Sequence, residues 1–430
     1  KSSAPDNHYF HKVDFTLPEY SEDILQKIPE KFKGDWDENA FFSMGYRHMC
    51  RYFSGAIYKD SFFENVDYML RIDCDSYFID KLDYDIFKLN ISKMKNFVNN
   101  NNVKLRPHAK MHKSVDIAEY QINYGGAHGI CCQKVSEAEV FAKGSIKDIL
   151  ITNQISNTLK IDRLTRIPLL GVTIGCCVDN LQNINDIQNS ASLNKTTIKI
   201  FVEYDCGANR CGLKSFNDIE KLINKINQSK NLIFSGFQAY NGSIQHIEDF
   251  NKRSIEVKKT CEKIKKLKSS FDNYKLEITG AGTGCFDLEV LENVYTEIQV
   301  GSYAFMDAHY SSLKKDHKIN NTILFNNSLF ILSSVMSTAN NGYPVVDAGL
   351  KSMSVDSGLP VTLNKNLNYI KCSDEHGVLS DPNSFLKIND KISLIPGHCD
   401  PTCNLHDWYV VVKDNFVKEI WPVSARGYSF

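Results

Sequence analysis

The chain has 430 residues with 50 Lys and Arg against 51 Asp and Glu, which gives a formal net charge of −1. A hydrophobic content of 42% excludes a disordered chain, and the length excludes a small disulfide-stapled fold. The balanced charge argues against a nucleic-acid partner, and the lack in the sequence of any apolar run near the ~18 residues that cross a bilayer argues against a membrane partner.

The cysteine content bears on the compartment. Thirteen cysteines cannot all pair within one chain, and two pairs of them are neighbours, Cys131–Cys132 and Cys176–Cys177. Separate thiols fit this spacing better than a disulfide framework. Residues 1–30 also show no apolar segment typical of a secretory signal. We therefore expect a cytoplasmic protein, or one from another reducing compartment.

Residues 1–74 and residues 75–318 differ in the pattern of their apolar side chains. Residues 1–74 are rich in aromatic side chains without a regular period, and we expect this leader to pack on the core. From residue 75 to 318, short apolar runs alternate with segments of helical period, the first of them a helix over 84–98. The strand candidates are Tyr77–Ile79, Lys104–His108, Gly129–Cys131, Ile149–Thr152, Gly171–Ile174, Ile198–Glu203, Phe234–Gln238, Leu276–Thr279 and Glu297–Val300.

Eight or nine short strands separated by helical spacers predict an α/β fold with a closed (β/α)8 barrel, of the kind known as a TIM barrel. The first strand candidate, before residue 84, could instead belong to the last part of the chain. In that part, residues 319–430, apolar runs follow one another without helical spacers, which predicts a mostly antiparallel β domain. A barrel places its chemistry at the carboxyl ends of the strands.

The first candidate site follows the strand that starts at Lys104. In a strand, alternate residues share a face, so His108, Lys110 and His112 are expected to point together into the barrel mouth. A lysine there is costly unless it is paired or used, for example as a Schiff base with a carbonyl cofactor. A solvated basic cluster at the end of a surface strand explains the spacing more simply.

Two further segments are weaker signals taken singly. The turn Thr279–Gly284, with the letters TGAGTG, could cradle a phosphate through its backbone N–H groups, although such a turn is more often only a turn. The segment from Glu203 to Arg210 places acids and an arginine at a strand end, which a salt-bridged loop also explains.

The fourth segment contains His398 and Asp400, which share a face if the backbone there is extended. An imidazole and a carboxylate suit a divalent metal such as Mn²⁺, Mg²⁺ or Zn²⁺. Cys399 would then point away from the pair. Without context, a hydrogen-bonded His–Asp pair in a turn is the simpler explanation.

Taken together and in this order, the segments resemble the fold-type III pyridoxal-phosphate (PLP) enzymes, and among them the D-threonine aldolase and D-serine dehydratase family. The matching stretches are Arg106–Lys110, Gly129–Glu139, Asp148–Asn153, Asp205–Gly212, Gly236–Tyr240, Thr279–Gly284, Gly301–Asp307, Asp347–Lys351 and His398–Asp400. Any one of them is weak, but nine in sequence order are specific.

The resemblance implies a PLP site. Lys110 would be the Schiff-base lysine and Arg210 would face the phenolic oxygen of the cofactor. Gln299 lies near the position at which related racemases have an arginine that faces the pyridine nitrogen. The phosphate would be held by Thr279, Gly280, Gly282, Thr283, Gly284, Gly301, Ser302 and Tyr303.

The resemblance also implies a metal on His398 and Asp400. The dehydratase branch has His-x-Cys at this place and uses zinc, whereas this chain has the His-x-Asp of the aldolases. A carboxylate is harder than a thiolate, which favours Mn²⁺ or Mg²⁺ and leaves Zn²⁺ open. Candidates for the catalytic base are His108, His246 beside the Tyr240 loop, and a metal-bound water. Tyr240 is a further candidate catalytic residue.

The implied reaction is the retro-aldol cleavage of D-3-hydroxy amino acids, such as D-threonine to glycine and acetaldehyde. Two alternatives stay open: a dehydratase acting on D-serine or D-3-hydroxyaspartate, and a PLP-binding protein without turnover. The resemblance also implies a homodimer with the active site at the interface. The chain departs from its relatives at Met111, usually Thr, and at Asn241, where His is common.

Overall fold

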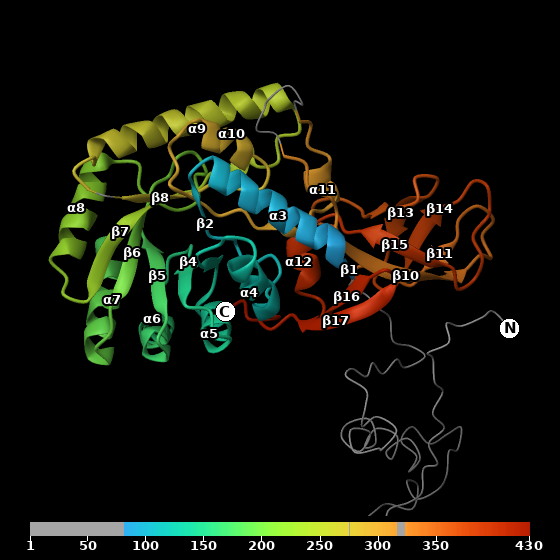
Figure 1. The fold of residues 1–430 in the computed structure, drawn as a ribbon, viewed down its shortest axis with the longest axis horizontal. Coiled ribbons are helices and arrows are strands. Elements are labelled where there is room, and N and C mark those ends of the chain that lie inside the picture. The colour runs from blue at the N-terminus through green and yellow to red at the C-terminus, as the bar shows by residue number, and fades with distance from the viewer. Residues whose placement is uncertain (1–80, 275, 316–322) are drawn as a thin grey trace, which may run out of the picture. The chain divides into compact units, whose positions relative to one another are not determined.

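The computed structural model describes residues 81–274, 276–315 and 323–430 (Figure 1). The leader and the strand expected at Tyr77–Ile79 lie outside these residues. The described part contains two sheets, one of eight parallel strands and one of nine mostly antiparallel strands. None of its helices combines the length and apolarity that a membrane crossing requires. Its cysteines are all free thiols.

The eight parallel strands form the barrel in the order β2-β9-β8-β7-β6-β5-β4-β3. Single bridges between Leu105 and Ala127 and between His108 and Cys131 join β2 to β3 and close the ring. The expected (β/α)8 barrel is confirmed. Its strands are β2 (Lys104–Leu105), β3 (Ile130–Cys132), β4 (Asp148–Ile151), β5 (Thr173–Val178), β6 (Ile198–Glu203), β7 (Leu232–Ala239), β8 (Glu277–Gly280) and β9 (Glu297–Ile298).

Helices alternate with these strands and flank them in Figure 1. Helix α8 shows why they form: Ile219, Leu222, Ile223 and Ile226 recur at helical spacing and are buried, and the Ser215 side chain caps the first turn. The helices are α3 (Tyr84–Asn100), α4 (Val115–Asn123), α5 (Val135–Lys143), α6 (Thr158–Arg166), α7 (Leu181–Asn194), α8 (Phe216–Asn227), α9 (Phe250–Ser270), α10 (Phe286–Leu291) and α11 (Ala308–Ser311).

The second sheet takes in both ends of the described chain. Strand β1 (Lys81–Asp83) pairs antiparallel with β10 (Leu329–Ser337) and parallel with β16 (Trp408–Lys413). The chain therefore passes through this sheet before it enters helix α3 and the barrel. The other strands are β11 (Val345–Val346), β12 (Val361–Thr362), β13 (Asn368–Cys372), β14 (Gly377–Ser380), β15 (Lys391–Ile395) and β17 (Phe416–Pro422).

Aromatic side chains join part of this sheet to the barrel. The ring of Phe87 in α3 lies 5.7 Å from that of Trp421, and Phe305 lies 5.4 Å from Tyr409. All four rings belong to the same buried cluster as the barrel core. Helix α12 (Cys399–Cys403) also belongs to it through two buried cysteines. This shared core fixes α12 against the barrel.

Candidate active site

A cavity of about 210 Å³ lies where the carboxyl ends of the barrel strands meet α12. Its walls bring together residues from the barrel loops and from α12 that are up to 292 positions apart, from His108 to Asp400. Twelve of the residues predicted from the sequence line it: His108, Lys110, Arg210, Tyr240, His246, Gly282, Thr283, Gln299, Gly301, Ser302, His398 and Asp400.

Lys110 stands at the centre of this cavity. Its Nζ lies 2.8 Å from Oδ2 of Asp400, and its side chain is 42% exposed. The carboxylate of Asp400 raises the pKa of Lys110, although burial opposes this. Burial alone would raise the pKa of Asp400, but the nearby charges of Lys110 and His398 lower it to about 2. The two groups therefore form an ion pair at neutral pH.

His112 does not join Lys110 in the cavity, so the expectation of three side chains on one face is wrong. Strand β2 ends at Leu105, and the chain turns over residues 109–112. The alternation of a strand therefore no longer applies. The His112 ring is buried instead, where its Nδ1 accepts from the N–H of Ser114. Burial lowers the pKa of His112 to about 3.

His398 and Asp400 also lie on a different backbone from the one expected. His398 is the N-cap of α12 and Asp400 is in the first turn, so the predicted extended segment is wrong. The pair nevertheless lines one cavity. Nδ1 of His398 lies 2.8 Å from Oδ2 of Asp356, which leaves Nε2 for a ligand. Cys399 between them is buried, and burial raises the pKa of its thiol.

This donor pair fits a divalent metal in part. A carboxylate that holds the other nitrogen of a histidine is the usual support of a metal-binding imidazole. Among the described residues, no group of three or more His, Cys, Asp and Glu side chains is arranged around one point. A metal on His398 and Asp400 would therefore take its remaining ligands from water or substrate.

Free backbone N–H groups form a cradle on one side of the cavity. The N–H groups of Thr283, Gly301 and Ser302 are buried, and within the described chain none of them donates to a protein acceptor. A Cβ at Gly301 would lie 2.8 Å from the backbone oxygen of His108, so only glycine fits there. Unused N–H groups that line one cavity can donate to a phosphate.

Four of the predicted phosphate residues do not line the cavity. Thr279 and Gly280 lie within β8, where the Thr279 hydroxyl donates to Glu297. A Cβ at Gly284 would lie 1.9 Å from the backbone of Gln245, which separates it from the cavity. The Tyr303 ring is buried away from the cavity and packs on Phe325.

The N–H groups of the Gly-rich turn are also partly used inside the protein. Gly282 donates to Glu289 at 3.2 Å, and Gly284 donates to Gln245 at 3.1 Å. Of the whole turn, Thr283 is thus the best placed to donate to a phosphate.

The candidate catalytic residues His108, His246 and Tyr240 differ in their ability to accept a proton. Both ring nitrogens of His108 are hydrogen-bonded, Nε2 to Thr152 at 3.0 Å and Nδ1 to the N–H of Lys110 at 3.4 Å. His246 instead stacks on His309, with ring centroids 4.2 Å apart. Burial and the neighbouring His309 lower the pKa of His246 to about 4. Burial raises the pKa of Tyr240 to about 12, so Tyr240 keeps its proton.

Arg210 and Gln299 differ in their exposure to solvent. Arg210 is exposed in the loop after β6, and its guanidinium lies 6.0 Å from the centre of the Tyr240 ring. Gln299 is buried after β9, and its amide pairs with that of Gln238. The cavity thus has a cation at its edge and neutral amides at its floor.

The cavity contains side chains that the sequence motifs did not single out. Thr152 and Gln238 line it, and each ends an expected strand, so the barrel rule could have found them. Gln133 follows β3 in the same way. Tyr310 lies on the short helix α11, and Asp356 supports His398 from a loop. Neither of these two follows a pattern that sequence reasoning can read.

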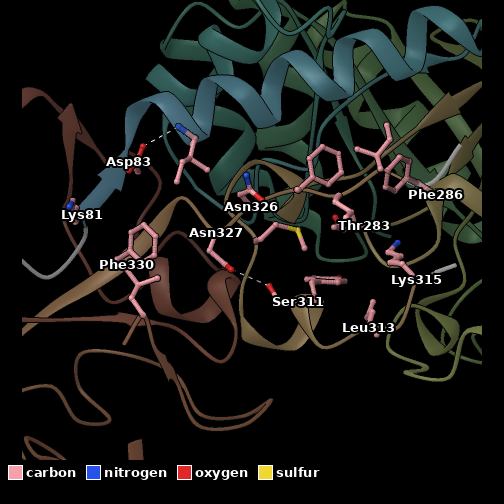
Figure 2. A pocket seen from close by; sticks show the side chains of 17 residues that line it. Lys81, Asp83, Thr283, Phe286, Ser311, Leu313, Lys315, Asn326, Asn327 and Phe330 are labelled. Carbon is pink, nitrogen blue, oxygen red and sulfur yellow. Dashed lines mark hydrogen bonds between the residues drawn. The ribbon is translucent and has the colours of Figure 1, made fainter. Parts of the chain in front are cut away.

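A second cavity of about 520 Å³ adjoins the first, with Thr283 and Tyr310 in the walls of both. Figure 2 shows that its walls mix apolar and polar side chains, with Lys315 between Phe286 and Leu313 and with Phe330 near Asn327. It contains none of the predicted Schiff-base or metal residues, so the smaller cavity is the candidate site.

Comparisons with known proteins find matches over most of the described chain. The family model "Alanine racemase, N-terminal domain" matches residues 82–309, and the serine dehydratase domain family matches residues 328–412. A glycolipid 2-alpha-mannosyltransferase model also matches residues 14–110, mostly outside the described chain and over too small a part to show a family.

Several relatives match most of the chain. The 3-hydroxy-D-aspartate aldolase of Paracoccus denitrificans (strain Pd 1222) is 46% identical over 351 residues, 80% of this chain and 91% of that protein. The D-threonine aldolase of Arthrobacter sp. is 36% identical over 84% of this chain and 95% of its own length. The crystal structure of D-threonine aldolase from Filomicrobium marinum superposes with a TM-score of 0.79 at 36% identity, covering 84% of this chain and 97% of that one.

Proposed function

Because the chain belongs to the alanine-racemase-like family of fold-type III PLP enzymes, we propose that it cleaves D-3-hydroxy amino acids into glycine and an aldehyde. The observation that carries this proposal is the ion pair of Lys110 and Asp400, with His398 beside it in one cavity. A cofactor lysine and a metal-binding pair in contact suit a reaction at two substrate positions separated by one carbon, Cα and the oxygen of the hydroxyl on Cβ.

The chain's own residues would hold the cofactor as follows. Lys110 would bind its aldehyde carbon, and Arg210 would face its phenolic oxygen. The free N–H groups of Thr283, Gly301 and Ser302 would donate to the phosphate. When bound, PLP supplies a carbonyl for the substrate amine and an electron sink for the bond that breaks.

The remaining side chains would handle protons and charge. His246 is neutral above pH 4 and would take the proton of the β-hydroxyl oxygen as the Cα–Cβ bond breaks. Tyr240 is protonated at neutral pH and would return a proton to Cα, which yields glycine. A metal held by His398 and Asp400, with Mn²⁺ or Mg²⁺ favoured over Zn²⁺ by the carboxylate, would supply Lewis acidity at the hydroxyl.

The named relatives suggest two substrates. D-threonine would give glycine and acetaldehyde, and 3-hydroxy-D-aspartate would give glycine and glyoxylate. A second candidate reaction is the dehydration of D-serine or D-3-hydroxyaspartate, which the match of residues 328–412 to a serine dehydratase domain favours. Dehydration releases a 2-oxo acid and ammonia in place of glycine and an aldehyde.

The products decide between these reactions. Protein loaded with PLP and Mn²⁺ is incubated with each substrate, and glycine, aldehyde, 2-oxo acid and ammonia are quantified. Glycine in equal amount to aldehyde supports the proposal, and a 2-oxo acid with ammonia supports dehydration. A cofactor absorbance band without any product would show a binding protein without turnover.

The role of Lys110 has a direct test. Lys110→Ala should lose both the cofactor absorbance band and activity. Lys351→Ala is a matched control, because Lys351 is 67% exposed and pairs with Glu375, which lies in the turn between β13 and β14. A cofactor band that persists in Lys110→Ala would contradict the assignment.

We also propose a homodimer that works in the cytoplasm or another reducing compartment. The free thiols of the described chain support the compartment, and the resemblance to the family supports the dimer. Light scattering at micromolar concentration tests the dimer, and a monomer there would contradict it.

A further inference from the structure

A chain of buried hydrogen bonds runs from the floor of the cavity into the barrel. Nε2 of Gln299 donates to Oγ1 of Thr279 at 2.8 Å, and that hydroxyl donates to Oε1 of Glu297 at 2.6 Å. Glu297 in turn accepts from Nε of Arg106 at 3.0 Å. All four residues are at most 4% exposed. We call this set the Gln299 network.

The charges at its inner end fix the direction of every bond. A guanidinium can only donate, so the carboxylate of Glu297 accepts from Arg106, and it is also 2.8 Å from His128. Burial alone would raise the pKa of Glu297, but Arg106 and His128 lower it to about 2. The Thr279 hydroxyl has one proton and gives it to this carboxylate.

The direction of the Thr279 hydrogen bond also fixes the orientation of the Gln299 amide. With its proton used, the Thr279 oxygen can only accept, so the NH₂ of Gln299 must face it. A flipped amide would place two acceptor oxygens 2.8 Å apart in a buried site, which is costly. The second amide hydrogen of Gln299 goes to Oε1 of Gln238 at 2.7 Å. Both hydrogens of Gln299 are therefore used inside the protein.

What Gln299 offers the cavity is an acceptor alone. Its Oε1 receives one bond from Nε2 of Gln238 at 3.1 Å and keeps a second lone pair. Under the proposed function, the cofactor brings a phosphate, a phenolic oxygen and a ring nitrogen. The phosphate and the phenolic oxygen are anionic and need donors, which Thr283, Ser302 and Arg210 supply. The ring nitrogen is the one group that can become a donor.

We infer that the Gln299 network holds the PLP ring nitrogen protonated, with Thr279 and Glu297 as positioning residues that act through Gln299. This inference rests on the proposed function. A protonated ring nitrogen draws electron density from Cα more strongly than a neutral one, which suits the cleavage of a Cα–Cβ bond. A donor at the same place would hold the ring nitrogen unprotonated.

The test reads the ring nitrogen itself. Holoenzyme is prepared with ¹⁵N-labelled PLP, and the ¹⁵N NMR shift at pH 8 reports the ratio of protonated to unprotonated ring. We expect a mainly protonated ring in the wild type. Thr279→Val leaves Gln299 free to turn, and the ratio should fall about tenfold or more, since a hydrogen bond to a charged group contributes roughly 1.5–3 kcal/mol.

Two further variants make the result specific. Thr279→Ser keeps the hydroxyl and should keep the ring protonated. Thr196→Val is the matched control, because its buried hydroxyl donates to the backbone of Thr165 and not to this network. If Thr279→Val does not fold, Gln299→Arg replaces the acceptor with a donor and must give an unprotonated ring.

The possible failures are distinguishable. Absence of the cofactor absorbance band would contradict the proposed function itself. A wild-type band with an unprotonated ring would overturn the inference and leave the proposed function standing. An unchanged ratio in Thr279→Val, or a protonated ring in Gln299→Arg, would overturn the positioning role.

Discussion

Nζ of Lys110 lies 2.8 Å from Oδ2 of Asp400. The lysine belongs to the first turn after β2, and the aspartate belongs to α12, which packs on the barrel core. The contact means that one carboxylate serves two cations: the free ammonium of Lys110, and the metal that we propose at His398 and Asp400. The ammonium of Lys110 and the metal therefore compete for the carboxylate of Asp400.

Metal binding should therefore depend on the cofactor. When Lys110 is bound to PLP, its ammonium no longer competes for Asp400, so the metal should bind more tightly. We expect about a 5- to 150-fold lower Kd for Mn²⁺ in the holoenzyme than in the PLP-free enzyme, the usual range of coupling between two sites. Titration of free Mn²⁺ by electron paramagnetic resonance measures it.

The matched variant for this coupling is Lys110→Met, which removes the ammonium. Its Mn²⁺ affinity should be high and should not respond to PLP. Equal affinities for Mn²⁺ in the PLP-free and PLP-loaded wild type would refute the competition.

Asp356 should matter through His398. Its carboxylate lies 2.8 Å from Nδ1 of the imidazole and fixes Nε2 as the free nitrogen. Asp356→Asn should weaken Mn²⁺ binding about 10- to 100-fold, with kcat largely restored at saturating Mn²⁺. Asp374→Asn, an exposed aspartate of the same domain, is the control. A variant with unchanged Mn²⁺ affinity would show that the His398–Asp356 bond has no supporting role.

His246 gives a prediction on pH. Since its pKa is lowered to about 4, it is neutral and able to accept a proton at any pH well above that value. On the acid side, the decrease in kcat/KM due to this group should be centred near pH 4 and not near 6.5, the pKa of an ordinary histidine. His246→Asn should lower kcat by about 10²- to 10⁴-fold, whereas the exposed His376→Asn should not. An acid limb that remains in His246→Asn would assign it to another group.

Glu297 should govern part of the acid stability. Its pKa is about 2 in the folded chain against 4.5 as an ordinary carboxyl group. Below pH 4.5 the unfolded chain binds a proton that the folded chain does not, so the free energy of unfolding falls as pH falls from 4.5 to about 2. The full loss is about 3 kcal/mol for this group.

Urea unfolding at several pH values checks this slope. Glu297→Gln should flatten the fall in the free energy of unfolding between pH 4.5 and 2, even though it also lowers stability at pH 7 by leaving Arg106 unpaired. Glu375→Gln, at an exposed ion pair, should keep the wild-type slope. A wild-type slope in Glu297→Gln would contradict the depressed pKa.

The barrel could be predicted because its strands are apolar runs of the right length. The run Ile198–Glu203 has the bounds of β6, and the other runs overlap their strands. The sequence did not predict correctly whether individual side chains point into the cavity. His112 lies beyond the end of β2, and Thr279 points into the barrel because it lies on β8. Strand ends decide such directions, and the sequence does not mark them sharply.

The support of the site was harder to predict than its centre. Lys110, His398 and Asp400 belong to motifs with a recognisable order along the chain. Tyr310 reaches the cavity from the short helix α11, and Asp356 contacts His398 from a loop; only the packed fold brings these two segments there. The Gln299 network depends on which atoms of buried polar groups face one another, and this follows from three-dimensional contacts and not from spacing.

The place of β1 bears on how the protein is made. Residues 81–83 are synthesised long before one of the two strands they pair with, at residues 408–413. The barrel strands, complete at residue 298, can close long before that. Until then β1 has an unpaired edge, which is a site for aggregation. The nascent chain should therefore depend on chaperones most after its barrel strands are complete and before residues 408–413 are made.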